Sequence, residues 1–115
     1  MWIMIAGPYR QNSDNPEVWE TNLKRLNSIA YQVFLRGHIP MIGVNLALPI
    51  IQSAGMDEYQ NLMLPISLAL SERCDAVLRI DGESSGADAE VRLFEEKGLP
   101  VYYEIDQLPA AAKHN

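Results

Sequence analysis

The sequence has little of three things that mark whole classes of protein: cysteine, basic side chains and long apolar runs. Cys74 is the only cysteine in 115 residues, so no disulfide can form within the chain, and a reducing compartment, the cytoplasm, is expected. Lys and Arg number 9 against 15 Asp and Glu, which gives a net charge of −6. A nucleic-acid-binding surface needs a basic patch, so no nucleic-acid partner is expected.

Membrane and cofactor signatures are missing as well. No run approaches the roughly 18 apolar residues of a membrane span, and the apolar start MWIMIAG is too short, and lacks the basic flank, for a signal peptide. His38, His114 and Cys74 are scattered and give no metal-ligand spacing. The phosphate-binding patterns G-x-G-x-x-G and G-x-x-x-x-G-K-[ST] do not occur. No membrane partner, metal or cofactor is therefore expected.

The hydrophobic residues that are present, 48% of the chain, suit a single domain over residues 1–115. The continuous apolar run Met1–Ala6 predicts a strand buried on both faces, as in a parallel sheet. A helix is predicted to begin at Asn15 and Pro16, a capping residue and a residue favoured at the first helical position. Apolar residues at helical spacing continue this helix to Gly37.

The middle of the chain is less regular. His38–Ile42 is predicted to be a short second strand, and Pro40 favours an edge position for it. The apolar but Gly- and Pro-interrupted segment Gly43–Gly55 is interpreted as a loop or a short turn of helix. Met56–Arg73 is predicted to be helical, with Pro65 kinking that helix or starting a second one.

The last third predicts a strand, a helix and a strand, at Ala76–Ile80, Ser85–Lys97 and Pro100–Tyr103, followed by a short turn and a frayed tail. Alternation of strands and helices predicts an α/β fold: an open, doubly wound, flavodoxin- or Rossmann-like parallel sheet. Four to five strands in an order of about 2-1-3-4, with helices on both faces, are expected. Such sheets bind ligands at the carboxyl ends of their strands.

The segment Ser84–Asp88 (SSGAD) opens the helix after the third strand. Ser85 is expected to cap this helix, with Asp88 as a capping-box partner. Gly86 lets a ligand approach the backbone, and the free N–H groups of a helix N-terminus favour a phosphate or a sugar hydroxyl. Two interpretations of this segment are therefore possible: a plain helix cap and an anion-binding site. A serine nucleophile is not favoured, because His38 begins a strand at the opposite edge of the sheet and the other histidine lies in the tail.

One carboxylate lies on the face of this helix that is predicted to be buried. Ala87, Glu90 and Phe94 share that face, whereas Asp88 and Glu95 are expected to face solvent. Burying a carboxylate against a sheet is costly unless it is paired or meets a polar cavity. Glu90 therefore either lies at the edge of the apolar stripe and reaches water, or lies at the floor of a ligand crevice as a nucleophile or base.

Two stretches resemble the nucleoside 2-deoxyribosyltransferase superfamily: IAGPYR near the start and CDAVLRIDGESSGADAEVRLFEEKGLPVYY near the end. The most specific part is the S-x-G-x-x-x-E pattern of Ser84, Gly86 and Glu90, followed by a G-x-P-V strand start. The resemblance spans nearly the whole chain. It is strongest to the compact deoxyribosyltransferase-like branch of unknown function.

The resemblance implies cleavage or transfer of the N-glycosidic bond of a nucleoside or nucleoside 5′-monophosphate. Glu90 matches the glutamate that attacks the anomeric carbon and forms a glycosyl-enzyme intermediate. Ser84 matches a small polar residue that holds the sugar or its 5′-phosphate, and a serine welcomes phosphate where an acid would repel it. The other positions expected to line the crevice, with Arg10 meeting phosphate, are Gly7, Tyr9, Arg10, Asn45, Ser85 and Gly86.

The sequence departs from the family at one position. The family carries an aspartate eight residues before Asp75, which helps the leaving base or orients the nucleophile, and this chain has Ser67 there. Asp57 or Glu58 can substitute only if the proline break redirects the helix. Asp81, at the carboxyl end of the third strand, is another candidate acid, and its alternative interpretation is a turn residue.

The resemblance also implies a homodimer or homotetramer, and the apolar segment 46–51 (LALPII) suits such an interface. Trp19 and Met63 are expected in the core. Three functions are open: an N-glycosidic enzyme, a non-catalytic nucleotide-binding protein that has kept the crevice but lost the family acid, and an interaction module with receiver-like topology. A receiver would need an acidic cluster after the first strand, where this chain has IAGPYR.

Overall fold

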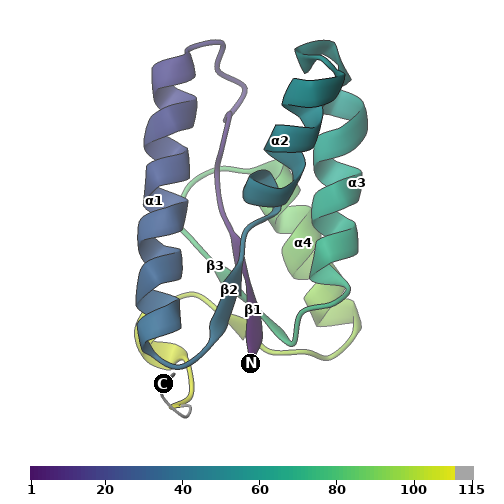
Figure 1. Cartoon of the computed structure of the whole chain (residues 1–115). Coiled ribbons are helices and arrows are strands. Elements are labelled where there is room, and N and C mark those ends of the chain that lie inside the picture. Colours follow the sequence, from purple (N-terminus) through teal and green to yellow (C-terminus); the bar gives the residue numbers. More distant parts are fainter. Residues whose placement is uncertain (111–115) are drawn as a thin grey trace.

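The computed structural model describes residues 1–110, and strands alternate with helices along this part of the chain (Figure 1). The strands are β1 (Trp2–Ala6), β2 (Ile39–Met41), β3 (Ala76–Arg79) and β4 (Val101–Tyr102). The helices are α1 (Pro16–Leu35), α2 (Gly43–Ala54), α3 (Tyr59–Ser71) and α4 (Ser85–Glu96), with short 3-10 turns at Met56–Glu58 and Ile105–Gln107. None of these helices is both long and apolar enough to cross a membrane.

The four strands form one parallel sheet in the order β2-β1-β3-β4. The predicted α/β fold and strand order are therefore confirmed. β2 is an edge strand, as Pro40 suggested, and Pro40 lies opposite Ile3 of β1. Because all four strands are parallel, their carboxyl ends share one edge of the sheet, where the loops after β1, β2 and β3 begin.

Helices cover both faces of the sheet, as predicted. Side chains of β1 alternate between the faces: Ile3 and Ile5 join one core cluster, whereas Met4 and Ala6 join the other. The first cluster includes Leu26 and Val33 of α1. The second includes residues of α4, with Leu70 of α3 packed against it, and α2 packs on α3 (Figure 1). β1 is buried on both faces, and its continuous apolar sequence follows from that.

The prediction for segment 43–55 was wrong, because most of it forms the regular helix α2. Ala47 and Ile51 are fully buried one turn apart, so the segment gains a core face by coiling. Pro49 lies on the exposed side of the helix, where its ring does not disturb packing. Gly55, with φ +120°, ends the helix. Packing against α3 outweighs the local preference of glycine and proline against helix.

The region 56–73 is helical, as predicted, but its break lies elsewhere. A single helix, α3, runs through Pro65, so no second helix begins there. The irregularity comes earlier, at the 3-10 turn Met56–Glu58. Pro65 is exposed, like Pro49 of α2. The chain thus places two prolines in neighbouring helices on the solvent side.

The C-terminal segment folds back against the sheet. The predicted short turn is confirmed at Ile105–Gln107, and Leu108 is buried in the cluster beneath α1. Beyond β4, the Gln107 side-chain oxygen accepts hydrogen bonds from the backbone N–H of Tyr103 at 2.8 Å and of Glu104 at 3.2 Å. The predicted fraying of the last residues lies outside the described residues.

Candidate functional site

The loops after β1 and β3 lie side by side at the carboxyl edge of the sheet. The Gln11 side chain donates a hydrogen bond to the backbone oxygen of Glu83 at 3.4 Å. A Cβ atom on Gly82, where φ is +120°, would lie 2.6 Å from Cγ of Pro8. The two loops therefore approach so closely that the second needs glycine at this point.

Gly7, expected to lie beside a ligand, is placed in the core of this edge. A Cβ atom there would lie 3.1 Å from Cβ of Ile80 and 3.1 Å from Cδ2 of Leu26. In this structure Gly7 therefore lets the end of β1 pack against β3 and α1.

Ser84 caps the N-terminus of α4, which corrects the prediction that Ser85 does so. The Ser84 hydroxyl accepts a hydrogen bond from the backbone N–H of Ala87 at 3.1 Å, and Ser85 is the first helical residue. With the cap one residue earlier, Asp88 is no longer at the capping-box position. Its carboxylate instead binds Arg79 at 3.1 Å. A Cβ atom on Gly86 would meet only Cδ1 of Leu64, at 3.9 Å, so the backbone here is open to approach.

Glu90 lies on the buried face of α4, together with Ala87, Val91 and Phe94. The residue is only 7% exposed, so the interpretation in which it reaches water is wrong. Its Oε2 atom is buried and has no hydrogen-bond partner among the described residues. An unsatisfied carboxylate oxygen in an apolar core is costly, and such a position is commonly retained for chemistry rather than stability.

Burial changes the acidity of Glu90. Desolvation raises its pKa from 4.5 to about 7, and the Ser67 hydroxyl and the charge of Arg79 act in the opposite direction. At neutral pH a substantial fraction of the carboxyl groups is therefore ionised and the remainder protonated. A group in this range can act as a nucleophile, a base or an acid without a large further change.

Ser67, at the position where the resemblance expects an acid, lies beside Glu90 and is itself buried. Asp57 and Glu58 do not replace that acid. They precede α3, and Glu58 is about nine residues, or roughly 13 Å of helix, from Ser67. The Glu58 carboxylate accepts a hydrogen bond from Asn61 instead.

Arg10 is held by aromatic rings in the loop after β1. Its guanidinium carbon lies 4.1 Å from the centre of the Trp19 ring and 3.6 Å from that of Tyr59. The Tyr9 ring stacks on Tyr59 with 6.4 Å between ring centres. The Nε atom of Arg10 is buried without a partner among residues 1–110. Trp19, expected in the core, is only half-buried and contacts Arg10.

The two remaining predicted positions are engaged or exposed. Asn45, in the first turn of α2, exchanges amide hydrogen bonds with Asn27 of α1 at 2.7 and 3.3 Å. Asp81 is exposed after β3, and its backbone oxygen accepts a hydrogen bond from Arg25 at 2.7 Å. This contact agrees with a turn residue. Neither side chain is among the groups that shift the Glu90 pKa, which are Ser67 and Arg79.

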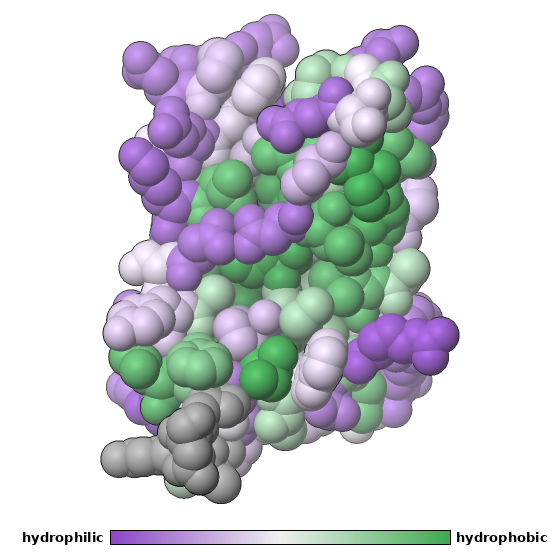
Figure 2. Space-filling view, in the orientation of Figure 1, coloured by the Kyte–Doolittle hydropathy of each residue, from purple (hydrophilic) through white to green (hydrophobic). Residues whose placement is uncertain are grey.

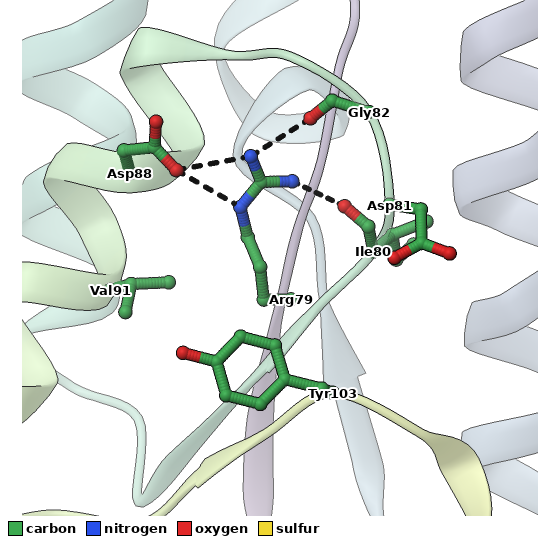
Figure 3. A pocket seen from close by; sticks show the side chains of 7 residues that line it. All are labelled: Arg79, Ile80, Asp81, Gly82, Asp88, Val91 and Tyr103. Carbon is green, nitrogen blue, oxygen red and sulfur yellow. Dashed lines mark hydrogen bonds and ion pairs between the residues drawn. The ribbon is translucent and has the colours of Figure 1, made fainter.

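A surface depression of about 270 Å³ lies beside α4 and is not lined by Glu90. Arg79 is among the residues that line it, and its guanidinium binds Asp88 at 3.1 and 3.3 Å, the backbone oxygen of Gly82 at 2.9 Å, and that of Ile80 (Figure 3). Asp81 points away from this guanidinium in the same view. The arginine therefore braces the loop between β3 and α4. This depression is less convincing as a reaction site than the Glu90 carboxyl, because most of the arginine's hydrogen-bonding capacity is already used.

Three of the residues described above were not predicted as site residues: Tyr59, Trp19 and Arg79. The sequence offers no local signal for Tyr59, because its partner Arg10 is distant along the chain, whereas Trp19 and Arg79 contact residues within nine positions of them. No protein-family model matches this chain, and no curated protein matches it. A function is therefore inferred from Glu90 and its surroundings.

Proposed function

We propose that the protein cleaves or transfers the N-glycosidic bond of a nucleoside or nucleoside 5′-monophosphate, with Glu90 as nucleophile. The observation that carries the proposal is the Glu90 carboxyl. It is buried, has a pKa of about 7, and has one oxygen without a partner. It also belongs to the S-x-G-x-x-x-E segment that resembles the nucleoside 2-deoxyribosyltransferase superfamily.

In the proposed reaction, an ionised oxygen of Glu90 attacks the anomeric carbon of the sugar. The bond from that carbon to the base nitrogen breaks, and the electron pair leaves with the base, which takes up a proton from solvent. Water or a second base then attacks the same carbon and releases the carboxylate. Burial favours the first step, because a poorly solvated carboxylate has little hydration to lose on attack.

The start of α4 supports a phosphate or sugar hydroxyl beside this centre. Ser84, Ser85 and Gly86 lie where the helix presents its positive end and free N–H groups. The Ser84 hydroxyl accepts a bond from Ala87, and its own proton is free to be donated to a ligand oxygen. Arg10 and Tyr9 follow β1 at the same edge of the sheet, and Arg10 is the proposed second contact for phosphate.

A homodimer or homotetramer is part of the proposal. Large apolar side chains are exposed on the outer side of α2 and α3, where Figure 2 shows a broad hydrophobic area. Leu46 and Ile50 of α2 and Leu64 of α3 are each about two-fifths exposed or more. Neither described depression opens onto Glu90, and a second chain completing the site would fit both observations. Light scattering of the wild type and of Ile50→Glu tests the assembly.

The alternative is a non-catalytic nucleotide-binding protein, and Ser67 is the observation that favours it. A serine cannot protonate a leaving base as a carboxylic acid does. No other acid side chain is among the groups that shift the Glu90 pKa. In this alternative the edge of the sheet still binds nucleotides, but the bond to the base stays intact.

The test is incubation of the purified protein with deoxynucleosides and their 5′-monophosphates, with chromatography for free base. Glu90→Gln, which has nearly the same shape, is the matched control. Release of base by the wild type and not by the variant supports the enzyme. Release of base by both the wild type and Glu90→Gln excludes Glu90 as nucleophile. No release, combined with nucleotide-dependent thermal stabilisation of both proteins, supports the binding protein instead.

A further inference from the structure

α3 packs on both α2 and α4, and Leu64 of α3 approaches Gly86 of α4, so that Ser67 and Glu90 lie one turn further along these two helices. Gly43 is the first residue of α2, Ser67 lies in the third turn of α3, and Glu90 lies in the second turn of α4. All three residues are buried, and Ser67 is 5% exposed. A Cβ atom on Gly43 would lie 2.0 Å from the Ser67 hydroxyl oxygen and 2.7 Å from Ser67 Cβ. Only glycine therefore leaves room for the serine side chain where α2 packs on α3.

The surroundings of Glu90 offer few other polar groups. Neither α2 nor α3 contains an Asp, Glu, Lys or Arg, and β1 contains none either. Arg79 of β3 lowers the Glu90 pKa, but its guanidinium is already bonded to Asp88 and to backbone oxygens. Cys74 has a pKa raised to about 11, so its thiol is neutral near pH 7 and adds no charge.

We propose that Ser67 is the positioning residue for Glu90: its hydroxyl, confined by the close approach of Gly43, donates a hydrogen bond to one carboxylate oxygen. This leaves the unpartnered Oε2 free to reach the anomeric carbon. The catalytic role of this hydrogen bond rests on the proposed function. The hydrogen bond itself does not.

The hydrogen bond has a measurable electrostatic consequence. A donor to the ionised form of a carboxyl lowers its pKa, and the Ser67 hydroxyl acts in this direction on Glu90. Removing the hydroxyl must then raise the Glu90 pKa further and reduce the ionised fraction at neutral pH. A second acid at this position would do the same, because two buried carboxylates repel each other.

The test uses Ser67→Ala, with Ser71→Ala as the matched control. Ser71 is buried on the same helix one turn later, but its hydroxyl donates to the backbone oxygen of Ser67 at 2.9 Å. The titration of the Glu90 carboxyl carbon is followed by NMR, with Glu90→Gln identifying its resonance. Ser67→Ala is expected to raise the pKa by about one unit and Ser71→Ala to leave it nearly unchanged. No shift in Ser67→Ala, or equal shifts in both variants, overturns the proposal.

Gly43→Ala provides a second route to the same result. The added methyl group pushes the Ser67 hydroxyl away, so the titration is expected to move in the same direction as in Ser67→Ala. Where wild-type base release is detectable, the rising limb of its pH profile is expected to shift with the NMR titration in both variants. The NMR experiment needs no turnover. The inference and the proposed function can therefore fail separately. A protein without activity can still show the shift in the Glu90 pKa, and an active protein can lack that shift.

Discussion

The two loops that meet at the carboxyl edge of the sheet hold their arginines in opposite ways. At the β3 loop, the guanidinium of Arg79, the last residue of β3, is bonded to Asp88 and to two backbone oxygens, and its side chain is 12% exposed. After β1, the guanidinium of Arg10 lies against the rings of Trp19 and Tyr59. Ring contacts leave N–H groups available to a ligand, whereas carboxylate and carbonyl contacts consume them. The β3 loop is therefore a brace, and the β1 loop is a candidate contact for anions.

The largest effect on stability is expected from Glu90, which lies on α4, the helix that follows the β3 loop. Because folding raises the Glu90 pKa from 4.5 to about 7, the folded state binds the proton more tightly. The wild type then loses stability as the pH rises from about 4.5 to 7 and loses no more above that range. Glu90→Gln lacks this loss, and it is expected to be more stable by on the order of 3 kcal/mol at about pH 8. Urea unfolding across this range measures the difference. A difference in unfolding free energy between the two proteins that does not vary with pH would contradict a raised pKa for the buried Glu90 carboxyl.

The next effect tests the brace itself. Arg79→Met keeps much of the side-chain volume but removes every hydrogen bond to Asp88, Gly82 and Ile80. A loss of about 2 kcal/mol in the free energy of unfolding is expected, because the Asp88 carboxylate and two backbone oxygens lose a charged donor. Arg92→Met, at an exposed position of α4, is the control and is expected to change little. Equal stability of the two variants would refute the distinction between the loops.

The corresponding change in the β1 loop is expected to act on ligands more than on stability. Arg10→Ala should weaken the binding of nucleoside 5′-monophosphates about tenfold more than that of the parent nucleosides, since only the monophosphates carry the phosphate. Isothermal titration calorimetry with matched pairs measures the ratio. Arg10→Lys keeps the charge without the planar stack and is expected to fall between. Equal weakening of both ligand classes would remove the phosphate contact from the proposal.

The smallest effect concerns the rings that hold Arg10. Tyr59→Leu removes the ring 3.6 Å from the guanidinium carbon, and a loss of about 0.5–1 kcal/mol in stability is expected. Tyr59→Phe keeps the ring and should stay near the wild type. Thermal denaturation of both variants checks this, and a similar loss in both would assign the effect to the hydroxyl rather than to stacking.

The parts of the fold that follow from short-range patterns could be predicted from the sequence. β1 is buried on both faces, so its apolar run identifies it, and Asn15 with Pro16 begins α1 as expected. α2 escaped prediction because the packing of Ala47 and Ile51 against neighbouring elements outweighs its glycine and proline. The cap of α4 was missed by one residue, since either of two adjacent serines can cap and the length of the preceding loop decides.

The candidate site could be predicted only in part. Periodicity places Glu90 on the buried face of α4, and the structure agrees. Neither Ser67 nor Gly43, which packs on Ser67, could be found in this way, because both belong to other helices. The contact of Arg10 with Tyr59 likewise joins residues far apart in the sequence. Such contacts depend on how helices pack across the sheet, which no local pattern encodes.

The Gln107 side chain has a consequence for how the protein behaves in concentrated solution. Its oxygen accepts hydrogen bonds from the backbone N–H groups of Tyr103 and Glu104. These donors would otherwise extend the exposed edge of β4 beyond its last residue. A free strand margin is a template on which another chain can add a strand and start a fibril. With β4 limited to two residues and its extension blocked by the chain's own amide, ordered aggregation has little backbone to begin from on this side.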